Sequence, residues 1–175
     1  MPIVNSNLGA WRFGETGQPV DRFGKLKVII WHSELVNIYG SSIGEGTKVA
    51  AFVEIGNAVI GARCKIEAFA FIPPGTIIED NVFIGPHVTI TNDKYPNLLQ
   101  PGWKPKPVMI RRGARVGANA TILPGVTVGK GALIGAGAIV THDVPDKCFV
   151  YGHAGTTINV HKGRKERIKP RSPLL

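Results

Sequence analysis

The sequence has few of the features that mark secreted, membrane or disulfide-rich proteins. Among 175 residues only Cys64 and Cys148 are cysteines, so a disulfide framework is not indicated and a reducing compartment is favoured. The longest apolar runs, 28–31 and 132–140, are far shorter than the roughly 20 residues of a membrane span. Residues 1–10 lack the charged-then-apolar order of a signal peptide. We therefore expect a cytoplasmic protein with no membrane partner.

Long helix-compatible windows are also missing. The chain holds 22 Gly and 13 Pro, so spread that no stretch offers the roughly 12 or more uninterrupted residues that a helical protein repeats. Turns must recur often, which favours β structure. The length is that of one domain, and 43% hydrophobic residues suffice for a sizeable core.

Acidic residues are scarce relative to basic ones, which gives a formal charge of +9 and favours an anionic partner. The basic residues crowd into 162–171, where no aromatic side chains are interleaved to stack on bases. This arrangement argues against a nucleic-acid partner. It leaves two interpretations of the tail, namely a contact for a phosphorylated small molecule or a solvated charged surface.

What the chain does have is an internal repeat of six residues. A branched aliphatic residue returns every six positions, with one single-residue deletion and one interruption. These aliphatic positions are Ile43, Val49, Ile55, Ile60, Ile66, Ile72, Ile78, Ile84, Ile90, Ile110, Val116, Ile122, Val128, Ile134 and Val140. Small or short branched residues precede them by two positions at Ala58, Cys64, Ala70, Thr76, Val82, Val88, Ala114, Ala120, Val126, Ala132 and Ala138. Gly often follows the aliphatic residue, where we expect it to tolerate a tight bend.

A period of six fits neither an α-helix, which repeats every 3.6 residues, nor a two-faced strand, which repeats every two. If each hexad forms one short strand and one corner, three hexads close a triangular coil, and stacked coils pair their strands in parallel. The aliphatic residue then points inward and the small residue fits near a corner. A β-sandwich would instead show spacings of roughly 8–12 residues with variable turns. The sequence therefore predicts an all-β parallel β-helix of hexapeptide repeats.

The most specific stretches are Gly-Ala-Asn-Ala-Thr-Ile-Leu-Pro-Gly-Val-Thr-Val-Gly at 117–129 and Ile-Gly-Ala-Gly-Ala-Ile-Val-Thr-His-Asp-Val-Pro at 134–145. They resemble the bacterial transferase hexapeptide family. The resemblance implies a left-handed winding, an exception to the usual right-handed crossover, together with a homotrimer and acetyl-CoA as co-substrate. We expect the left-handed β-helix domain at 31–158, an N-terminal segment of unknown packing at 1–30 and a basic tail at 159–175.

The repeat is interrupted at 91–107, which is long for a structureless connection in a compact domain and typical of a functional loop. Four prolines, at 96, 101, 105 and 107, stiffen this extruded loop. The resemblance implies that it reaches toward a neighbouring subunit and helps to wall the active site. A surface insertion without chemistry is the alternative.

The resemblance also implies a site for the thioester carrier. Unpaired backbone groups along an unobstructed groove can hold its amide-rich pantetheine arm. Ala118 and Ala136, eighteen residues apart, match positions of main-chain contact, and Thr141 and His142 match contacts nearer the phosphates. The family commonly has Lys in place of His142, so cationic groups of the tail are also candidates for the phosphates. These tail residues are Lys162 and Arg164.

The acceptor side is indicated by the run Thr91-Asn92-Asp93-Lys94-Tyr95. In sugar O-acetyltransferases of the family a His that deprotonates a hydroxyl stands where this chain has Tyr95, and a phenol of ordinary pKa about 10 is poor at that task. A neutral amine is itself nucleophilic and needs mainly positioning. The Thr91-Asn92 pair is similar to that of nucleotide-sugar 3-N-acetyltransferases. The similarity implies that Asn92 orients the amine or the thioester carbonyl, and that Asp93 holds the ammonium or takes its proton.

Three further residues are candidates for the site. His87, at an outward position of its hexad, is the best imidazole for a base, with an ordinary surface histidine as the alternative. Glu67 follows an inward aliphatic residue and can face the acceptor cleft. Asn119 is either a turn residue or a ligand contact.

Together these features predict an acetyl-CoA-dependent N-acetyltransferase acting on an amino sugar, nucleotide-linked, in surface-polysaccharide biosynthesis. One alternative is a sugar O-acetyltransferase that uses His87 as its base, and another is a non-catalytic β-helix binding module. No metal is expected, because the five histidines lack the clustered spacing of the family's zinc-binding, carbonic-anhydrase-like members.

Overall fold

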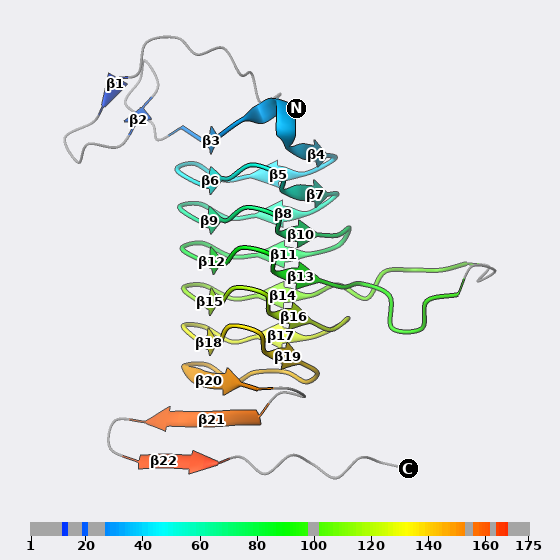
Figure 1. Cartoon of the computed structure of the whole chain (residues 1–175), viewed down its shortest axis with the longest axis vertical. Coiled ribbons are helices and arrows are strands. Elements are labelled where there is room, and N and C mark those ends of the chain that lie inside the picture. The colour runs from blue at the N-terminus through cyan, green and yellow to red at the C-terminus, as the bar shows by residue number, and fades with distance from the viewer. Residues whose placement is uncertain are drawn as a thin grey trace.

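The structure, a computed structural model, describes residues 12–13, 19–20, 27–97, 102–152, 156–161 and 164–167, with side chains in 27–97 and 102–152. From residue 27 onward, the described residues form a tall prism of short strands stacked in coils (Figure 1). Their one helical turn is the 3₁₀ helix η1, Ser33–Leu35. Within this part of the chain, no helix is long and apolar enough to cross a membrane.

Three sheets of parallel strands form the sides of the prism. Sheet 1 contains β3 (Ile29–Ile30), β6 (Lys48–Val49), β9 (Lys65–Ile66), β12 (Phe83–Ile84), β15 (Arg115–Val116), β18 (Leu133–Ile134) and β20 (Cys148–Tyr151). Sheet 2 contains β4 (Asn37–Tyr39), β7 (Glu54–Gly56), β10 (Phe71–Ile72), β13 (Thr89–Ile90), β16 (Thr121–Ile122) and β19 (Ile139–Val140). Sheet 3 contains β5 (Ser42–Ile43), β8 (Val59–Ile60), β11 (Ile77–Ile78), β14 (Met109–Ile110) and β17 (Thr127–Val128). Each coil passes through sheets 1, 2 and 3 in turn, so the prism has three edges: corners 1/2, 2/3 and 3/1.

The inward column of aliphatic side chains is the core. In sheet 1, for example, Ile66 pairs in register with Val49 on one side and Ile84 on the other. Of the fifteen aliphatic positions in the repeat, all but the half-buried Ile43 are at most 2% exposed, and every small residue of the repeat is buried as well. Full burial of such a side chain is worth about 1.5–3 kcal/mol, so each added coil stabilises the stack. The prediction of an all-β parallel β-helix is confirmed.

The glycines that follow several of the aliphatic residues have a different role from the expected one. Gly61 and Gly117 do not have positive φ angles. A Cβ atom on Gly117 would lie 2.6 Å from the amide nitrogen of Ala136, and one on Gly61 equally close to the amide nitrogen of Asp80. These glycines therefore allow consecutive coils to approach closely, and the tight bend falls two residues later, at positions such as Asn119 (φ 57°) and Arg63 (φ 54°).

The long loop leaves the prism without breaking the stack. It begins after β13 and ends before β14, at corner 2/3, and extends away from the prism (Figure 1). The strands on either side still pair as consecutive coils: Ile77 with Met109 and Thr89 with Thr121. The coils can therefore accept the insertion because it replaces a corner and not a strand.

The chain ends add antiparallel strands. At the C-terminal end β21 (Thr156–His161) pairs antiparallel with β20, and β22 (Arg164–Arg167) pairs with β21, so both extend sheet 1. The expected domain limit at residue 158 thus falls inside β21. Near the N-terminus β1 (Arg12–Phe13) and β2 (Pro19–Val20) form a small antiparallel pair.

Candidate functional site

Corner 1/2 gathers five of the predicted site residues. Its tightest positions, one per coil, all have positive φ: Phe52, Phe69, His87, Asn119 and Gly137. Each of them donates its backbone N–H to the coil above, as His87 does to the carbonyl oxygen of Ala68 at 3.0 Å. The predicted residues that lie along this edge are Glu67, His87, Ala118, Asn119 and Ala136.

His87 is held in a stack of rings. Its imidazole lies 4.6 Å from the Phe69 ring, centroid to centroid, with 5° between the planes, and Phe69 stacks in turn on Phe52 at 4.8 Å. The imidazole is exposed, and its ring nitrogens have no hydrogen-bond partner within residues 27–97 and 102–152. An imidazole fixed by stacking and open to solvent can accept a proton from a bound ligand.

Ala118 and Ala136 offer backbone donors. In residues 27–97 and 102–152 no hydrogen bond uses the amide N–H of either alanine. At the equivalent positions of corner 3/1 the amides of Ala62, Arg112 and Lys130 are instead bound by acidic side chains at 2.7–2.9 Å. The amides of Ala51 and Ala68, at the same position in two coils nearer the N-terminus, are unengaged in these residues as well, so corner 1/2 presents four N–H groups, two on each side of Pro86. This is the arrangement that main-chain contacts to a pantetheine arm require.

Glu67 is not free on this edge, because its carboxylate forms an ion pair with Lys65 at 2.5 Å. Asn119 adopts the bend conformation that asparagine tolerates well, which fits a turn residue, and its exposed side chain remains open to a ligand. Both residues lie within reach of a ligand only from outside the prism.

Asn92 anchors the base of the loop at corner 2/3. Its side-chain Nδ2 donates to the carbonyl oxygen of Pro74 at 3.1 Å, and its own carbonyl accepts the N–H of Lys106 at 2.8 Å, where the loop returns. Thr91 Oγ1 donates to the carbonyl oxygen of Ile122 at 3.0 Å. Within residues 27–97 and 102–152, the Oδ1 atom of Asn92 has no hydrogen-bond partner, and the contact on Nδ2 fixes its direction.

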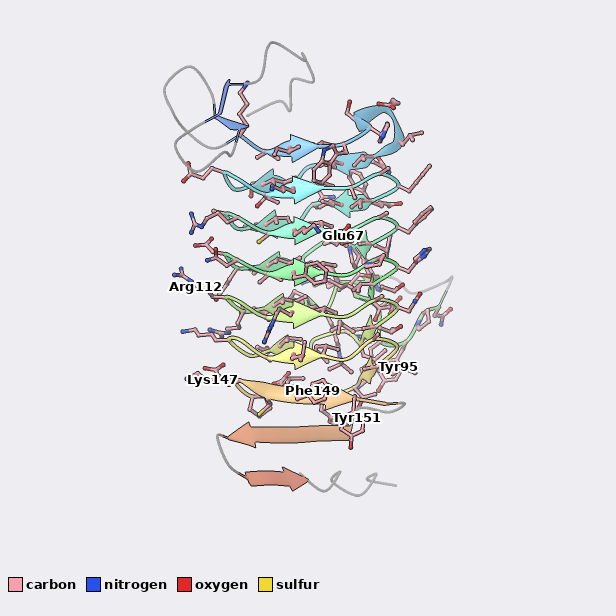
Figure 2. All side chains as sticks on the ribbon, turned by 60° about the vertical axis from the view of Figure 1, so that its left-hand side comes forward. Glu67, Tyr95, Arg112, Lys147, Phe149 and Tyr151 are labelled. Carbon is pink, nitrogen blue, oxygen red and sulfur yellow. The ribbon has the colours of Figure 1, made fainter. Side chains whose placement is uncertain are left out.

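The two residues that follow in the loop differ in exposure. Asp93 is half-buried and its Oδ1 accepts the backbone N–H of Tyr95 at 3.0 Å, which shapes the start of the loop. The Tyr95 side chain is 68% exposed and lies on the opposite side of the prism from Arg112 (Figure 2). Within residues 27–97 and 102–152, the other carboxylate oxygen of Asp93 has no hydrogen-bond partner.

The predicted phosphate contacts are spread over the last coils. Thr141 Oγ1 and His142 Nδ1 lie 2.9 Å apart at corner 2/3, which leaves the other ring nitrogen of His142 exposed. Lys162 is outside the described residues, and only the backbone of Arg164 is described, at the start of β22. Because Asn159 pairs with Cys148, the end of β21 lies beyond the beginning of β20, on the side of corner 3/1.

The chain thus brings the predicted residues to separate edges and not to one site. His87, Ala118 and Ala136 lie along corner 1/2, and Asn92 and Asp93 lie at corner 2/3, with the width of sheet 2 between them. No three His, Cys, Asp or Glu side chains in the described part of the chain are placed to hold a metal ion.

Two features were not foreseen from the sequence. The first is the stack of Phe52, Phe69 and His87, which a comparison of the same corner position in successive hexads would have revealed. The second is an open hollow of about 460 Å³ on the lower part of sheet 3, lined in part by Arg111, Lys130 and Asp143. No sequence signal pointed to the hollow, because its lining comes from three separate coils.

Comparison with known proteins supports the repeat assignment. The family model for "Bacterial transferase hexapeptide (six repeats)" matches residues 57–92 and 107–142. The bifunctional protein GlmU of Thermotoga maritima is 33% identical over 130 residues, which are 73% of this chain and 27% of that protein. The chain thus spans about a quarter of the length of the first curated relatives it matches.

Solved structures share the fold. A mutant of GDP-perosamine N-acetyl transferase from Caulobacter crescentus, in complex with CoA and GDP-perosamine, has a TM-score of 0.62 at 24% identity over 73% of this chain and 54% of that one. A mutant of AntD, an N-acyltransferase from Bacillus cereus in complex with dTDP and coenzyme A, has a TM-score of 0.66 at 23% identity over 81% and 87%. With its matched repeats and its stacked coils, the chain belongs to the hexapeptide-repeat acyltransferase family.

Proposed function

We propose that the protein is an acetyl-CoA-dependent N-acetyltransferase whose acceptor is a nucleotide-linked amino sugar. The observation that carries the proposal is the pair of unengaged amides at Ala118 and Ala136, which suits the pantetheine arm of acetyl-CoA. Thr141 and His142, at corner 2/3, are the proposed contacts of the phosphate end, whereas β22, which begins at Arg164, starts on the side of corner 3/1. The GDP-perosamine and dTDP complexes of the two structural neighbours support the acceptor class.

A homotrimer would complete the site. In a cyclic trimer one side of each prism faces the threefold axis, and the two edges of that side lie at the contacts with the two neighbouring copies. At each contact, one edge of this side therefore meets the other edge of the same side in the next copy. Only sheet 2 in that position brings corner 1/2 of one subunit against corner 2/3 of the next. Each cleft would then hold His87, Ala118 and Ala136 from one copy, with Asn92 and Asp93 from its neighbour.

The outward edge is consistent with this arrangement. With sheet 2 toward the axis, corner 3/1 points to solvent, and it carries charged side chains such as Arg112 and Lys147, which project from one edge of the prism (Figure 2). Charged side chains are favoured on solvated surfaces and disfavoured in the centre of subunit contacts.

The reaction requires that the amine be positioned against the thioester and that its nitrogen lose one proton. The neutral amine nitrogen attacks the thioester carbonyl carbon, and the carbon–sulfur bond breaks as the tetrahedral species collapses. The nitrogen loses a proton to the His87 imidazole or the Asp93 carboxylate, and the CoA thiolate takes up a proton as it leaves. Asn92 Oδ1 accepts an N–H of the amine and aims its lone pair. We place the reaction in the cytoplasm, within surface-polysaccharide biosynthesis.

Acetyl transfer to matched acceptors tests the reaction. Acetyl-CoA would be mixed with a nucleotide-linked amino sugar and, separately, with the sugar that has a hydroxyl at the same carbon, and release of the CoA thiol would be followed. We expect transfer to the amine. Transfer to the hydroxyl alone, abolished by His87→Ala, would replace the proposal by an O-acetyltransferase, and no transfer to either together with no binding to immobilised CoA would favour a binding module.

Mixed trimers test the shared cleft. His87→Ala and Asn92→Ala would each lower activity as homotrimers. If the cleft uses His87 of one copy and Asn92 of the next, refolding the two variants together in equal amounts restores intact clefts at about one in four by random assembly. Activity that stays at the level of the two separate variants would place both groups in one subunit.

A further inference from the structure

Corner 1/2 carries rings where a bend favours glycine or asparagine. Phe52, Phe69 and His87 have φ angles of 60°, 62° and 57°. A bulky side chain at positive φ is disfavoured, because its Cβ crowds the following carbonyl oxygen. At corners 2/3 and 3/1 the same position is held by Gly, Asn, Arg or Lys, and in the described residues every aromatic side chain at positive φ lies along corner 1/2. Backbone strain of this kind is concentrated at functional sites.

The rings form a continuous and half-open ladder. The planes of Phe52 and Phe69 lie within 12° of one another, and both side chains remain about half exposed, at 51% and 49%. The ladder stops below His87, where the corresponding residues are Asn119 and Gly137. A Cβ atom on Gly137 would meet nothing within 4 Å. The edge therefore has an aromatic half toward the N-terminus and an open half toward the C-terminus.

Two unengaged amides, of Ala51 and Ala68, also lie in the aromatic half, but the pair that the proposed function assigns to the thioester carrier, Ala118 and Ala136, lies in the open half. If the thioester carrier occupies it, the acceptor must approach from the aromatic half, with the reacting atoms near His87. The aromatic half thus lies where the remote part of the acceptor would extend.

Cations flank the aromatic half. Lys48 and Lys65 project from the outward face of sheet 1, paired in register, in the coils that carry Phe52 and Phe69 respectively. Glu67 forms an ion pair with Lys65 and precedes Phe69 by two residues, at the start of corner 1/2. An aromatic surface beside two ammonium groups and a carboxylate offers stacking for a planar ring, charge for a phosphate and an acceptor for a ring N–H.

We propose that Phe52 and Phe69 form a nucleobase platform, and that Lys48 and Lys65 face the diphosphate of the same ligand. The inference rests on the proposed function and adds to it the part of the acceptor that the aromatic half binds. It also gives a reason for the strained rings, since a ring is the side chain that a base can pack against and Asn or Gly is not.

The test uses Phe69→Asn and Phe52→Asn. Asparagine is native at this position of the same corner, at Asn119, so these changes remove a ring and relieve the backbone without threatening the fold. Lys147→Asn is the matched control, because Lys147 has the same conformation (φ 59°) at corner 3/1. The probes are UDP, dTDP and GDP without a sugar, with affinity measured by calorimetry and base contact by saturation-transfer NMR.

We expect at least one of the three diphosphates to bind with saturation transfer to its base protons. Each Phe→Asn variant should then lose about tenfold in affinity, and Lys147→Asn should bind as the parent does. Unchanged affinity in both Phe→Asn variants would overturn the platform and leave the acetyltransferase intact. Equal KM values for the free and the nucleotide-linked amino sugar would also overturn the platform and leave the acetyltransferase intact. A change of oligomeric mass in Phe69→Asn would also overturn it, by assigning the ladder to a subunit contact.

Discussion

Gly137 donates its backbone N–H to the carbonyl oxygen of Ala118 at 2.8 Å, and this bond joins two consecutive coils at corner 1/2. It satisfies the carbonyl of Ala118 but leaves the N–H of Ala118 and that of Ala136 unengaged. The edge is therefore held together by one set of backbone groups and presents another set outward. That division allows a ligand to use the main chain without competing with the fold.

Replacing Ala136 by Pro should weaken acetyl-CoA binding without unfolding the protein. Proline removes the amide N–H, and the coil two turns above already has Pro86 at the equivalent position after a glycine. The loss of one neutral hydrogen bond, about 0.5–1.5 kcal/mol, predicts a roughly 2- to 12-fold higher KM for acetyl-CoA. Steady-state kinetics with thermal unfolding as a check measures it. Ala136→Ser, which keeps the N–H, should behave as the parent does, and an unchanged KM in Ala136→Pro would refute the role of this amide.

Most of the fold could be predicted because its periodicity is strict. Each hexad places one β-branched residue inward and needs a small residue beside it. The burial of Ile84 and Val88 can therefore be predicted without any knowledge of distant contacts. The role of Gly117 was predicted wrongly, because close contact between coils eighteen residues apart depends on register and not on local conformation.

The candidate site was harder to predict than the fold. Asn92 and His87 are five residues apart in sequence, but the structure puts them at opposite edges of sheet 2. Sequence proximity suggested one cluster, whereas the triangular coil separates residues of neighbouring hexads onto different edges. The stack on His87 was not predicted, because Phe52, Phe69 and His87 are distant in sequence and come into contact only when consecutive coils stack.

Truncation of an inward residue should cost far more than truncation of its outward neighbour. Ile78 is 1% exposed and Ile77, next to it in β11, is 37% exposed. Ile78→Ala should lower the free energy of unfolding by about 2–5 kcal/mol, through lost burial and a residual cavity. Ile77→Ala should cost less than about 1 kcal/mol. Chemical denaturation of both variants decides the matter, and equal losses would contradict the assignment of inward and outward faces.

The carboxylate of Asp80 should matter more to stability than either of the arginines that it pairs with, Arg63 at 3.7 Å and Arg112 at 3.3 Å. Its Oδ1 accepts the N–H of Ala62 at 2.9 Å, and its Oδ2 lies 3.3 Å from Arg112, whose side chain is 65% exposed. Asp80→Ala leaves a corner amide without its partner and should cost about 1–3 kcal/mol, whereas Arg112→Ala removes an exposed ion pair worth about 0–1 kcal/mol.

The neutral variant Asp80→Asn separates the two contributions, because it retains the Oδ1 acceptor and loses the charge. Its free energy of unfolding should stay close to that of Arg112→Ala and respond little to added salt. If Asp80→Asn instead destabilises the protein as much as Asp80→Ala, charge and not the amide contact holds corner 3/1 together.

The two buried thiols should make the fold less stable in alkaline solution. Burial raises the pKa of the Cys64 thiol and that of the Cys148 thiol. The native state therefore keeps these protons to a higher pH than the unfolded chain, whose thiols ionise near pH 8.5. Their contribution to stability is complete below that pH and is lost as the pH rises through the native pKa values. Ala114 and Ala132 occupy the same corner position in other coils, so Cys64→Ala with Cys148→Ala preserves the shape of the column. Between pH 7.5 and 9.5 the melting temperature of the parent should fall more steeply than that of the double variant, as followed by circular dichroism, and parallel slopes would show that other groups set the alkaline limit.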